Sequence, residues 1–254
     1  MTPPVARPLA LIADIHGNLP ALEAVLADIR ARSIADAVNL GDHVSGPLWP
    51  RETAALLMQH EWPSIAGNHD RMVAHDDPSS HGPSDAYAFA QLTPLQRGWL
   101  AALPATREMR DGACLLCHGI PTDDRRYLLD TPEHGRLRLA RPPEIARRLG
   151  DARAAVVACG HSHVPRVVQH EGQLLVNPGS VGLPAYTHDG VHSHVSEVGS
   201  PLARYAVVEP GDGGPRIVFV ALAYDAAAAA TRAEANDRPD WAHALRTGYA
   251  SRDC

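Results

Sequence analysis

The residues that first indicate chemistry are Asp14 and His16, which follow the apolar run 9–13. A short apolar run bounded by turn residues predicts a buried strand, and side chains two residues apart in a strand lie on the same side of it. A carboxylate oxygen and an imidazole nitrogen together suit a divalent transition metal. The alternative interpretation is that Asp14 caps the next helix and His16 is an ordinary surface histidine.

Four later apolar segments also end in clusters of metal-competent residues. These clusters are Gly41-Asp42, Gly67-Asn68-His69-Asp70, His118-Gly119 and Gly160-His161-Ser162-His163. Taken singly, each has an ordinary interpretation as a turn or as a hydrogen-bonded polar residue. Ligands collect at the carboxyl ends of strands in open α/β sheets, so all five clusters are expected to converge at one sheet edge.

The elements that would position these clusters alternate between short strands and helices. Strands are expected at 9–13, 37–40, 64–66, 114–117, 154–158 and 174–176, and helices at 19–29, 51–61, 84–92, 94–103 and 143–149. A strand hairpin over 204–209 and 216–223 and an Ala-rich helix over 225–236 follow, whereas 186–201 is expected to be a long loop. This alternation predicts an α/β architecture.

The composition limits the possible partners. The chain has 254 residues, 45% hydrophobic residues and a formal net charge of -6, which argues against a nucleic-acid partner. It contains no lysine, which excludes a Walker-type phosphate loop and a Schiff-base mechanism. No stretch reaches the roughly 18 apolar residues of a membrane span, and residues 1–8 lack the apolar core of a leader. No membrane association and a cytoplasmic location are therefore expected.

The four cysteines, at positions 114, 117, 159 and 254, do not suggest a disulfide framework in a chain of this length. Cys114 and Cys117 have the spacing of a metal-binding pair, but no second pair exists. Because residues three apart in a strand point to opposite faces, both are expected to be core residues.

The ordered motifs D-x-H, GD, GNHD, H and GHSH resemble the calcineurin-like metallophosphoesterase superfamily. The segments 40–42 and 177–182 are similar more particularly to its small bacterial and archaeal phosphodiesterase branch. The resemblance implies a four-layer α/β fold, in which two mixed β-sheets pack as a sandwich flanked by helices. Since no linker or repeat divides the chain, residues 1–254 are expected to form a single metallophosphoesterase domain.

The resemblance also implies a dinuclear centre of divalent transition-metal ions, with Mn, Fe, Zn, Ni and Co as the candidates. One ion would be held by Asp14, His16 and His163, the second by Asn68, His118 and His161, and Asp42 would bridge them. Nitrogen and oxygen ligands without thiolate suit these metals better than a Cys-rich structural zinc site does. Two such ions, about 3.5–4 Å apart, generate a bridging hydroxide that attacks phosphorus in line.

Residues beside the ligand Asn68 are expected to act on the substrate. His69 is the candidate general acid for the leaving oxygen, and Asp70 would orient it. Asn68, His69 and Arg71 are the candidate substrate-binding residues, although Arg71 is equally compatible with a solvated surface position.

Several other polar residues leave two interpretations open. His43 either contacts the ligand residues or lies on a loop, and the charged run 123–126 either shapes substrate access or is solvated. The histidines between 186 and 194 are expected at the rim of the site rather than in a further metal site. The turn residues of 177–180 are expected to shape the backbone beside His161 and His163.

The function that follows is metal-dependent hydrolysis of small phosphate esters, with phosphodiesters favoured by the branch resemblance. One alternative is a phosphomonoesterase acting on proteins or nucleotides at the same site. The other is a non-catalytic metal-binding scaffold on the same fold. Substrate choice would depend on the cavity walls, expected at 75–103, 121–132 and 186–201, and the oligomeric state stays open.

Overall fold

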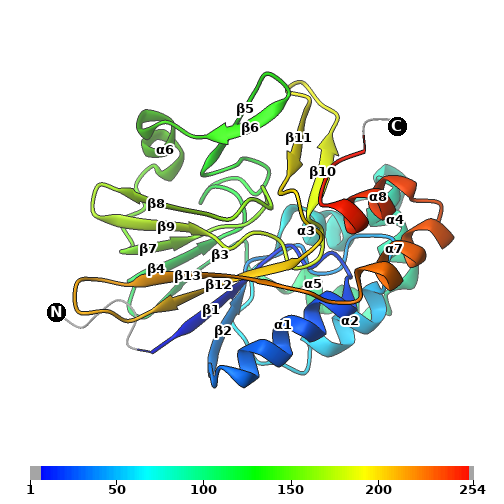
Figure 1. The fold of residues 1–254 in the computed structure, drawn as a ribbon, viewed down its shortest axis with the longest axis horizontal. Helices are drawn as coiled ribbons and strands as arrows, with labels where there is room; N and C mark the ends of the chain where they lie inside the picture. The colour runs from blue at the N-terminus through cyan, green and yellow to red at the C-terminus, as the bar shows by residue number, and fades with distance from the viewer. Residues whose placement is uncertain (1–6, 252–254) are drawn as a thin grey trace.

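Two mixed β-sheets form the centre of the structure, a computed structural model that describes residues 7–251 (Figure 1). The first sheet has the order β13-β12-β1-β2 and consists of β1 (Leu9–Ile12), β2 (Asp36–Asn39), β12 (Ala203–Glu209) and β13 (Arg216–Leu222). The second has the order β3-β4-β7-β9-β8 and consists of β3 (Thr106–Met109), β4 (Cys114–Cys117), β7 (Val156–Ala158), β8 (Arg166–His170) and β9 (Gln173–Asn177). The expectation of no leader at the N-terminus falls largely on residues outside the described range, as does Cys254.

Eight α-helices cover the sheets and the edge at which the strands end, within the described range. They are α1 (Leu19–Ala31), α2 (Pro50–Leu57), α3 (Asn68–His75), α4 (Pro83–Gln91), α5 (Pro94–Ala101), α6 (Pro142–Leu149), α7 (Ala226–Ala235) and α8 (Pro239–Thr247), with a 3₁₀ turn at Pro78–Ser80. Side-chain caps begin several of them. The Asn18 side chain accepts from the Ala21 amide at the start of α1, and Thr93 caps α5. None of the helices in residues 7–251 has the length and apolarity needed to cross a bilayer.

The sheets face each other across one apolar layer, which contains the buried side chains of Leu11 from β1 and Leu116 from β4. Alternate residues point outward: Ile12 packs beneath α1, and Cys117 lies in the cluster that includes α6. The order helix, sheet, sheet, helix confirms the expected four-layer fold. Cys114 and Cys117 point to opposite faces of β4, as predicted, and both are buried.

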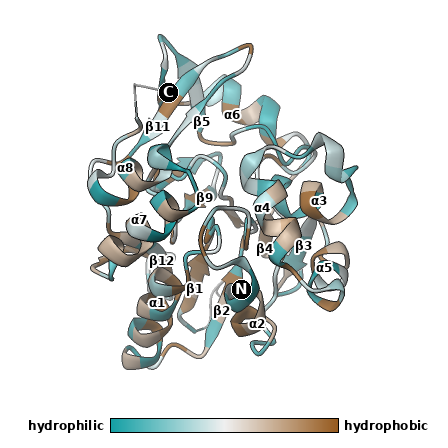
Figure 2. Ribbon diagram, turned by 90° about the vertical axis from the view of Figure 1, so that its right-hand side faces the viewer, coloured by the Kyte–Doolittle hydropathy of each residue, from teal (hydrophilic) through white to brown (hydrophobic). Residues whose placement is uncertain are grey.

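Parallel pairing brings the carboxyl ends of the key strands to one edge. β1 pairs with β2, β4 with β7, and β7 with β9, all in parallel. Figure 2 views this edge, with α7 and α8 on one side and α3, α4 and α5 on the other. The polar clusters predicted at the strand ends therefore face a space between two groups of helices.

A third sheet, at the top of Figure 1, departs from the prediction. Its order is β10-β11-β6-β5, and it consists of β5 (Asp130–Glu133), β6 (Arg136–Leu139), β10 (Ala185–His188) and β11 (His194–Glu197). The expected loop over 186–201 is therefore wrong in the part that forms β10 and β11. These strands are four residues long and rich in charged residues and histidine. β5 with β6 and β10 with β11 form hairpins, and β6 and β11, which are distant in the sequence, join the two hairpins.

Two further differences lie in the main sheets. β3 and β8 were not expected, and the strand predicted at 64–66 is reduced to a single bridge between Asn39 and Ser64. Immediately after it, the chain enters α3 at Asn68. The predicted cluster at residues 67–70 thus occupies a helix N-terminus rather than a loop.

The layer between the two sheets predicts a specific loss of stability. Replacing Leu116 by Ala should lower the free energy of unfolding by about 2–5 kcal/mol, because it leaves a cavity between the sheets. Urea unfolding followed by circular dichroism measures this loss. Leu95→Ala is the matched control, because Leu95 is 74% exposed and its truncation should change stability by less than about 0.5 kcal/mol. Equal midpoints for the two variants would contradict the proposed packing.

Candidate metal centre

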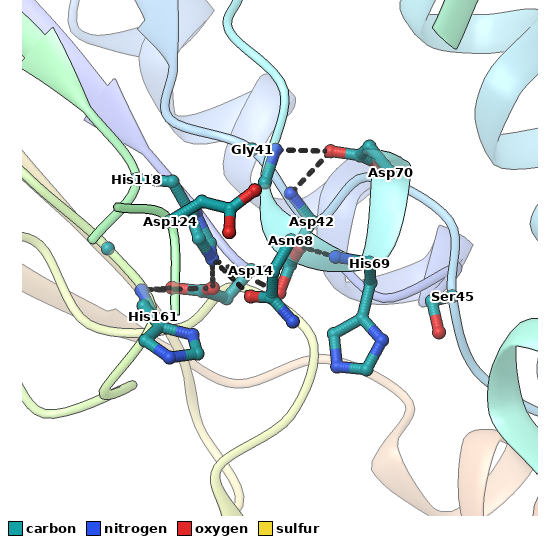
Figure 3. A network of polar contacts seen from close by, with 12 residues as sticks. Asp14, Gly41, Asp42, Ser45, Asn68, His69, Asp70, His118, Asp124 and His161 are labelled. Atoms are coloured by element: carbon teal, nitrogen blue, oxygen red, sulfur yellow. Dashed lines mark hydrogen bonds and ion pairs between the residues drawn. The ribbon is translucent and has the colours of Figure 1, made fainter. Parts of the chain in front are cut away.

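Seven side chains from distant parts of the chain meet at the strand edge. Asp14, His16 and His163 form one group, and Asp42, His118 and His161 form a second, with the ligand atoms of each group within 4.8 Å of one another. Asn68 joins the second group, because its Oδ1 lies 3.2 Å from His118 Nε2 (Figure 3). The structure therefore brings the seven predicted side chains together, with Asp42, the predicted bridge, in the second group.

Left-handed backbone turns the chain at these strand ends. Asp14, His16, Asp42, His161 and His163 have φ angles between +52° and +68°. Non-glycine residues seldom adopt this conformation, although Asp and His do so more readily than most. Its occurrence at five of the seven positions indicates that the surrounding structure holds these residues in place.

The turns after β1 and β2 are hydrogen-bonded to each other. The Asp14 amide donates to the Gly41 carbonyl and the His16 amide donates to the Asp42 carbonyl, each at 3.0 Å. Gly41 packs against Gly67 so closely that a Cβ on Gly41 would lie 2.4 Å from the Gly67 nitrogen. A Cβ on Gly67 would lie 2.1 Å from Asp42 Oδ1, so both positions require glycine.

Three of the histidines are aimed by backbone carbonyls. The Nδ1 atoms of His16, His118 and His163 lie 2.7, 2.8 and 2.7 Å from the carbonyl oxygens of Ser45, Leu40 and Leu183. Since a carbonyl only accepts, each Nδ1 carries a proton, and Nε2 is the nitrogen left for the cluster. His16 Nε2 and His163 Nε2 are 3.2 Å apart. Both Nε2 atoms thus face the same point, and a cation bound there would contact the two of them.

The charges of the cluster also suit a cation. Burial alone would raise the pKa of Asp42, but nearby imidazoles, chiefly His118 and His69, outweigh it and hold that pKa well below its usual range. Burial alone would lower the pKa of His118, but the Asp42 and Asp14 carboxylates raise it to about 10. In His16, burial prevails and lowers the pKa to about 4. The carboxylates thus stay charged, and a metal ion would replace the proton on His118.

His161 is held differently from the other three histidines. Its Nε2 lies 3.1 Å from the Arg125 carbonyl, which leaves Nδ1 for the cluster. Its backbone amide donates to the Asp14 carboxylate at 3.2 Å, which links the two groups. Burial, and then repulsion from His118, lowers the pKa of His161 to about 3, so its ring is neutral and able to bind a metal.

The segment 177–180 supports the loop that carries His161 and His163. The Asn177 side-chain amide donates to the Gly160 carbonyl, and the Ser180 hydroxyl donates to the Asp14 carbonyl, each at 2.7 Å. The role expected from its turn residues is therefore seen in the hydrogen bonds.

The prediction that Asp70 orients His69 is wrong. His69 Nδ1 lies 2.8 Å from Oδ1 of Asp85, in the first turn of α4. Asp70 instead turns back to the start of its own helix, where it accepts the Gly67 amide at 2.9 Å. Adjacent helical residues point about 100° apart, so Asp70 cannot follow the His69 ring.

Asp70 stabilises two turns of the site through hydrogen bonds that the sequence did not predict. Its carboxylate also accepts the backbone amides of Asp42 and His43, at 2.7 and 3.0 Å, and lies 2.7 Å from His43 Nδ1. The residues of this network are all buried: Asp42, His43, Gly67 and Asp70. Asp70 thus joins the turn that carries Asp42 to the turn that carries Asn68. His43, for which two interpretations were open, belongs to this network.

Arg71 does not lie where substrate binding was expected. Its guanidinium donates to both oxygens of Asp124, at 2.6 and 3.0 Å, and it does not line the cavity over the cluster. The predicted contact with phosphate has no support in this geometry. The pair does show that part of the charged run 123–126 is anchored rather than freely solvated.

A cavity of about 780 Å³ opens over the cluster. All three expected wall segments contribute to it, for example through Ser84, Arg125 and Tyr186. A fourth wall was missed: Arg238, Asp240, Trp241 and Ala244, at the start of α8 and within it, also line the cavity. Their sequence carries no motif, and only the packing of α8 against the site reveals them.

Two tyrosines on the expected walls lie beside the cluster, and the sequence did not single them out. The Tyr127 ring lies 4.8 Å from the His161 ring, and the Tyr186 ring lies 4.7 Å from the His163 ring. Their hydroxyls are 2.8 Å apart, and Tyr127 also contacts Nε2 of His194 at 2.8 Å. His188, from the segment expected at the rim, lines the cavity.

Comparisons with known proteins agree with this geometry. The profile of the calcineurin-like phosphoesterase superfamily domain matches residues 8–200. The chain is 28% identical over 255 residues to the uncharacterized protein MJ0912 of Methanocaldococcus jannaschii, covering 92% of this chain and 94% of that protein.

Two solved structures are similar over nearly the whole chain. A metallophosphoesterase from Sphaerobacter thermophilus has a TM-score of 0.74 and 27% identity, covering 96% of this chain and 100% of that one. The hypothetical protein PH1004 from Pyrococcus horikoshii has a TM-score of 0.72 and 19% identity, covering 96% and 99%, and shows the shared fold. With its motifs on one sheet edge and its profile match over residues 8–200, the chain belongs to the calcineurin-like metallophosphoesterase superfamily of metal-dependent phosphoric ester hydrolases.

Proposed function

We propose that this protein hydrolyses phosphodiesters at a centre of two divalent transition-metal ions, and that residues 1–254 act as one domain. The observation that carries the proposal is the division of seven ligand side chains into two adjacent groups. Asp42 lies between them, since its Oδ2 is 3.3 Å from His118 Nε2 and 3.8 Å from His16 Nε2. This position supports a bridging role for its carboxylate.

The donor set fits two ions such as Mn²⁺. Asp14, His16 and His163 would hold one, Asn68, His118 and His161 would hold the other, and Asp42 would contact both. Such ions, when bound, supply a nucleophile from water at neutral pH and offset the negative charge of the phosphoryl group. The carbonyl contacts at His16, His118 and His163 fix the orientation of the imidazoles in advance.

His69 would protonate the leaving oxygen. Its backbone amide donates to Asp42 Oδ1 at 3.0 Å, which fixes the residue beside the cluster, and its side chain lines the cavity. Burial alone would lower the pKa of His69, but the Asp42 and Asp85 carboxylates raise it to about 9. Both carboxylates favour the protonated ring, the form that a general acid needs, and Asp85 keeps this effect when Asp42 binds metal. Asn68, beside it, would contact the phosphoryl group.

The charges of the cavity favour a diester over a monoester. A phosphomonoester dianion carries one more negative charge than a diester and gains more from cationic side chains. Arg238 lines the cavity but pairs with Asp240, and Arg71 is committed to Asp124. Arg125 is the remaining arginine among the described residues that line the cavity. Beyond the proposed ions and His69, the arginines thus add little free positive charge to the cavity, which supports the monoanionic substrate.

Activity on a model diester tests the proposal. With Mn²⁺, the protein should hydrolyse bis-p-nitrophenyl phosphate with a higher kcat/KM than p-nitrophenyl phosphate, as followed by nitrophenolate absorbance. Asp42→Asn should lower kcat by about 10²-fold or more, because it weakens a ligand that both ions share. Asp151→Asn, on the exposed surface, is the control and should leave the rate unchanged.

The alternatives give different results. A higher kcat/KM on the monoester would indicate a phosphomonoesterase. No turnover of either ester by the metal-loaded protein would indicate a scaffold.

Metal binding has its own prediction, independent of activity. Titration of the metal-free protein with Mn²⁺ in a calorimeter should give two ions per chain, and His163→Ala should reduce this to one tight site. Binding at the His118 group should strengthen by about tenfold per pH unit between pH 6 and 8, because the metal displaces a proton whose pKa is about 10. His60→Ala is the control, since His60 stacks on Trp62 and is in neither group. One ion in the wild-type protein, or affinity independent of pH, would contradict the account.

A further inference from the structure

We infer that Asp85 and Ser45 form a positioning pair that aims His69 at the leaving group of the substrate, an inference that rests on the proposed hydrolysis. Oδ1 of Asp85 contacts both other residues: Ser45 Oγ donates to it at 2.6 Å, and His69 Nδ1 lies 2.8 Å from it. These three residues come from separate parts of the chain: the loop after β2, the first turn of α3 and the first turn of α4.

The Asp85 contact determines which ring nitrogen of His69 faces the cavity. A carboxylate oxygen accepts, so the His69 nitrogen beside it is a donor and carries its own proton. Nε2 is then the ring nitrogen available to a substrate. The Asp85 side chain is only 7% exposed, whereas that of His69 is 32% exposed and lines the cavity. Asp85 itself is not among the cavity-lining residues, so it acts through His69 rather than on the substrate.

Ser45 joins this pair to the metal ligands. Its hydroxyl donates to Asp85, while its carbonyl accepts from Nδ1 of His16 at 2.7 Å. The rings of His16 and His69 lie edge to face, with centroids 5.6 Å apart. A single buried residue therefore sets the orientation of a ligand of the first group and, through Asp85, that of the proposed acid.

Among the residues that the structure describes, no other carboxylate is placed to do this for the His69 ring. Asp70 is occupied by three backbone amides and His43. Asp42 Oδ1 accepts the backbone amide of His69, which fixes the main chain and leaves the ring free to rotate about its side-chain bonds. The contact with Asp85 limits rotation of the His69 ring, and the hydrogen bond from Ser45 limits rotation of the Asp85 side chain.

Leaving-group dependence tests the inference directly. The substrates are 4-nitrophenyl methyl phosphate, whose leaving group departs without help, and phenyl methyl phosphate, whose leaving group needs a proton. Asp85→Ala should lower kcat/KM for the phenyl ester by about 10–100-fold and for the nitrophenyl ester by less than about fivefold. Ser45→Ala should lower the phenyl rate by about two- to tenfold, because it removes one of the two hydrogen bonds to Asp85. The double variant should be no slower than Asp85→Ala, because Ser45 acts through Asp85.

Two measurements distinguish a positioning role of Asp85 from a general loss of structure in the variant. Manganese content, by atomic absorption, should stay at the wild-type value in Asp85→Ala. Nitrogen-15 NMR of the histidine rings should show His69 protonated at Nδ1 in the wild-type protein, with that signature lost in Asp85→Ala and partly kept in Asp85→Asn. Ser80→Ala and Asp151→Ala, both at the exposed surface, are the matched controls.

The outcomes distinguish this inference from the function beneath it. Equal losses on both esters, or an unchanged His69 signature in Asp85→Ala, would overturn the positioning role while leaving the hydrolase intact. No turnover of either ester by the wild-type protein would overturn the proposed function and this inference with it. If Asp85→Ala does not fold, the comparison of Asp85→Asn with Ser45→Ala gives the same test.

Discussion

Left-handed backbone is the constraint on which the metal-binding arrangement depends. Such a conformation costs a non-glycine residue of order 1–3 kcal/mol, and Asp14, His16, Asp42, His161 and His163 all adopt it. It turns the chain sharply at the strand ends, so that Asp14 and His16 serve one group while His161 and His163 serve different groups. The sandwich holds these residues in place, because the turns that carry them are fixed by buried strands and hydrogen-bonded to one another.

Buried hydrogen bonds then fix the orientation of the side chains that these turns position. Backbone carbonyl oxygens hold three of the histidine rings so that Nε2 faces the cluster. Asp70 accepts three backbone amides and contacts His43, which joins the turn of Asp42 to the turn of Asn68. Each contact removes a rotation that a bound ion would otherwise have to restrain. The same logic extends from the metal ligands to the proposed acid through Ser45 and Asp85. Ligands and acid are thus parts of one continuous network rather than separate sites.

The sequence singled out the seven side chains that the structure brings together because their pattern is local: Asp, Asn or His near Gly at the end of an apolar run. The α/β architecture followed from the same strands, and the four-layer fold followed from the resemblance that their motifs carry. Asp85 could not be predicted, because it lies 16 positions beyond His69 and only the packing of α4 against α3 brings them together. Asp70 was misassigned because proximity in sequence does not give direction on a helix. The third sheet was missed because β6 and β11 pair across almost 60 residues and each strand is only four residues long.

Two ions are expected to bind side by side at the strand edge, and crystals grown with Mn²⁺ would reveal them. Anomalous scattering at the manganese absorption edge locates the ions without reference to activity. We expect two peaks about 4 Å apart, one at Asp14, His16 and His163 and one at His118 and His161, with the Asp42 carboxylate between them. A single peak, or peaks away from Asp42, would contradict this expectation.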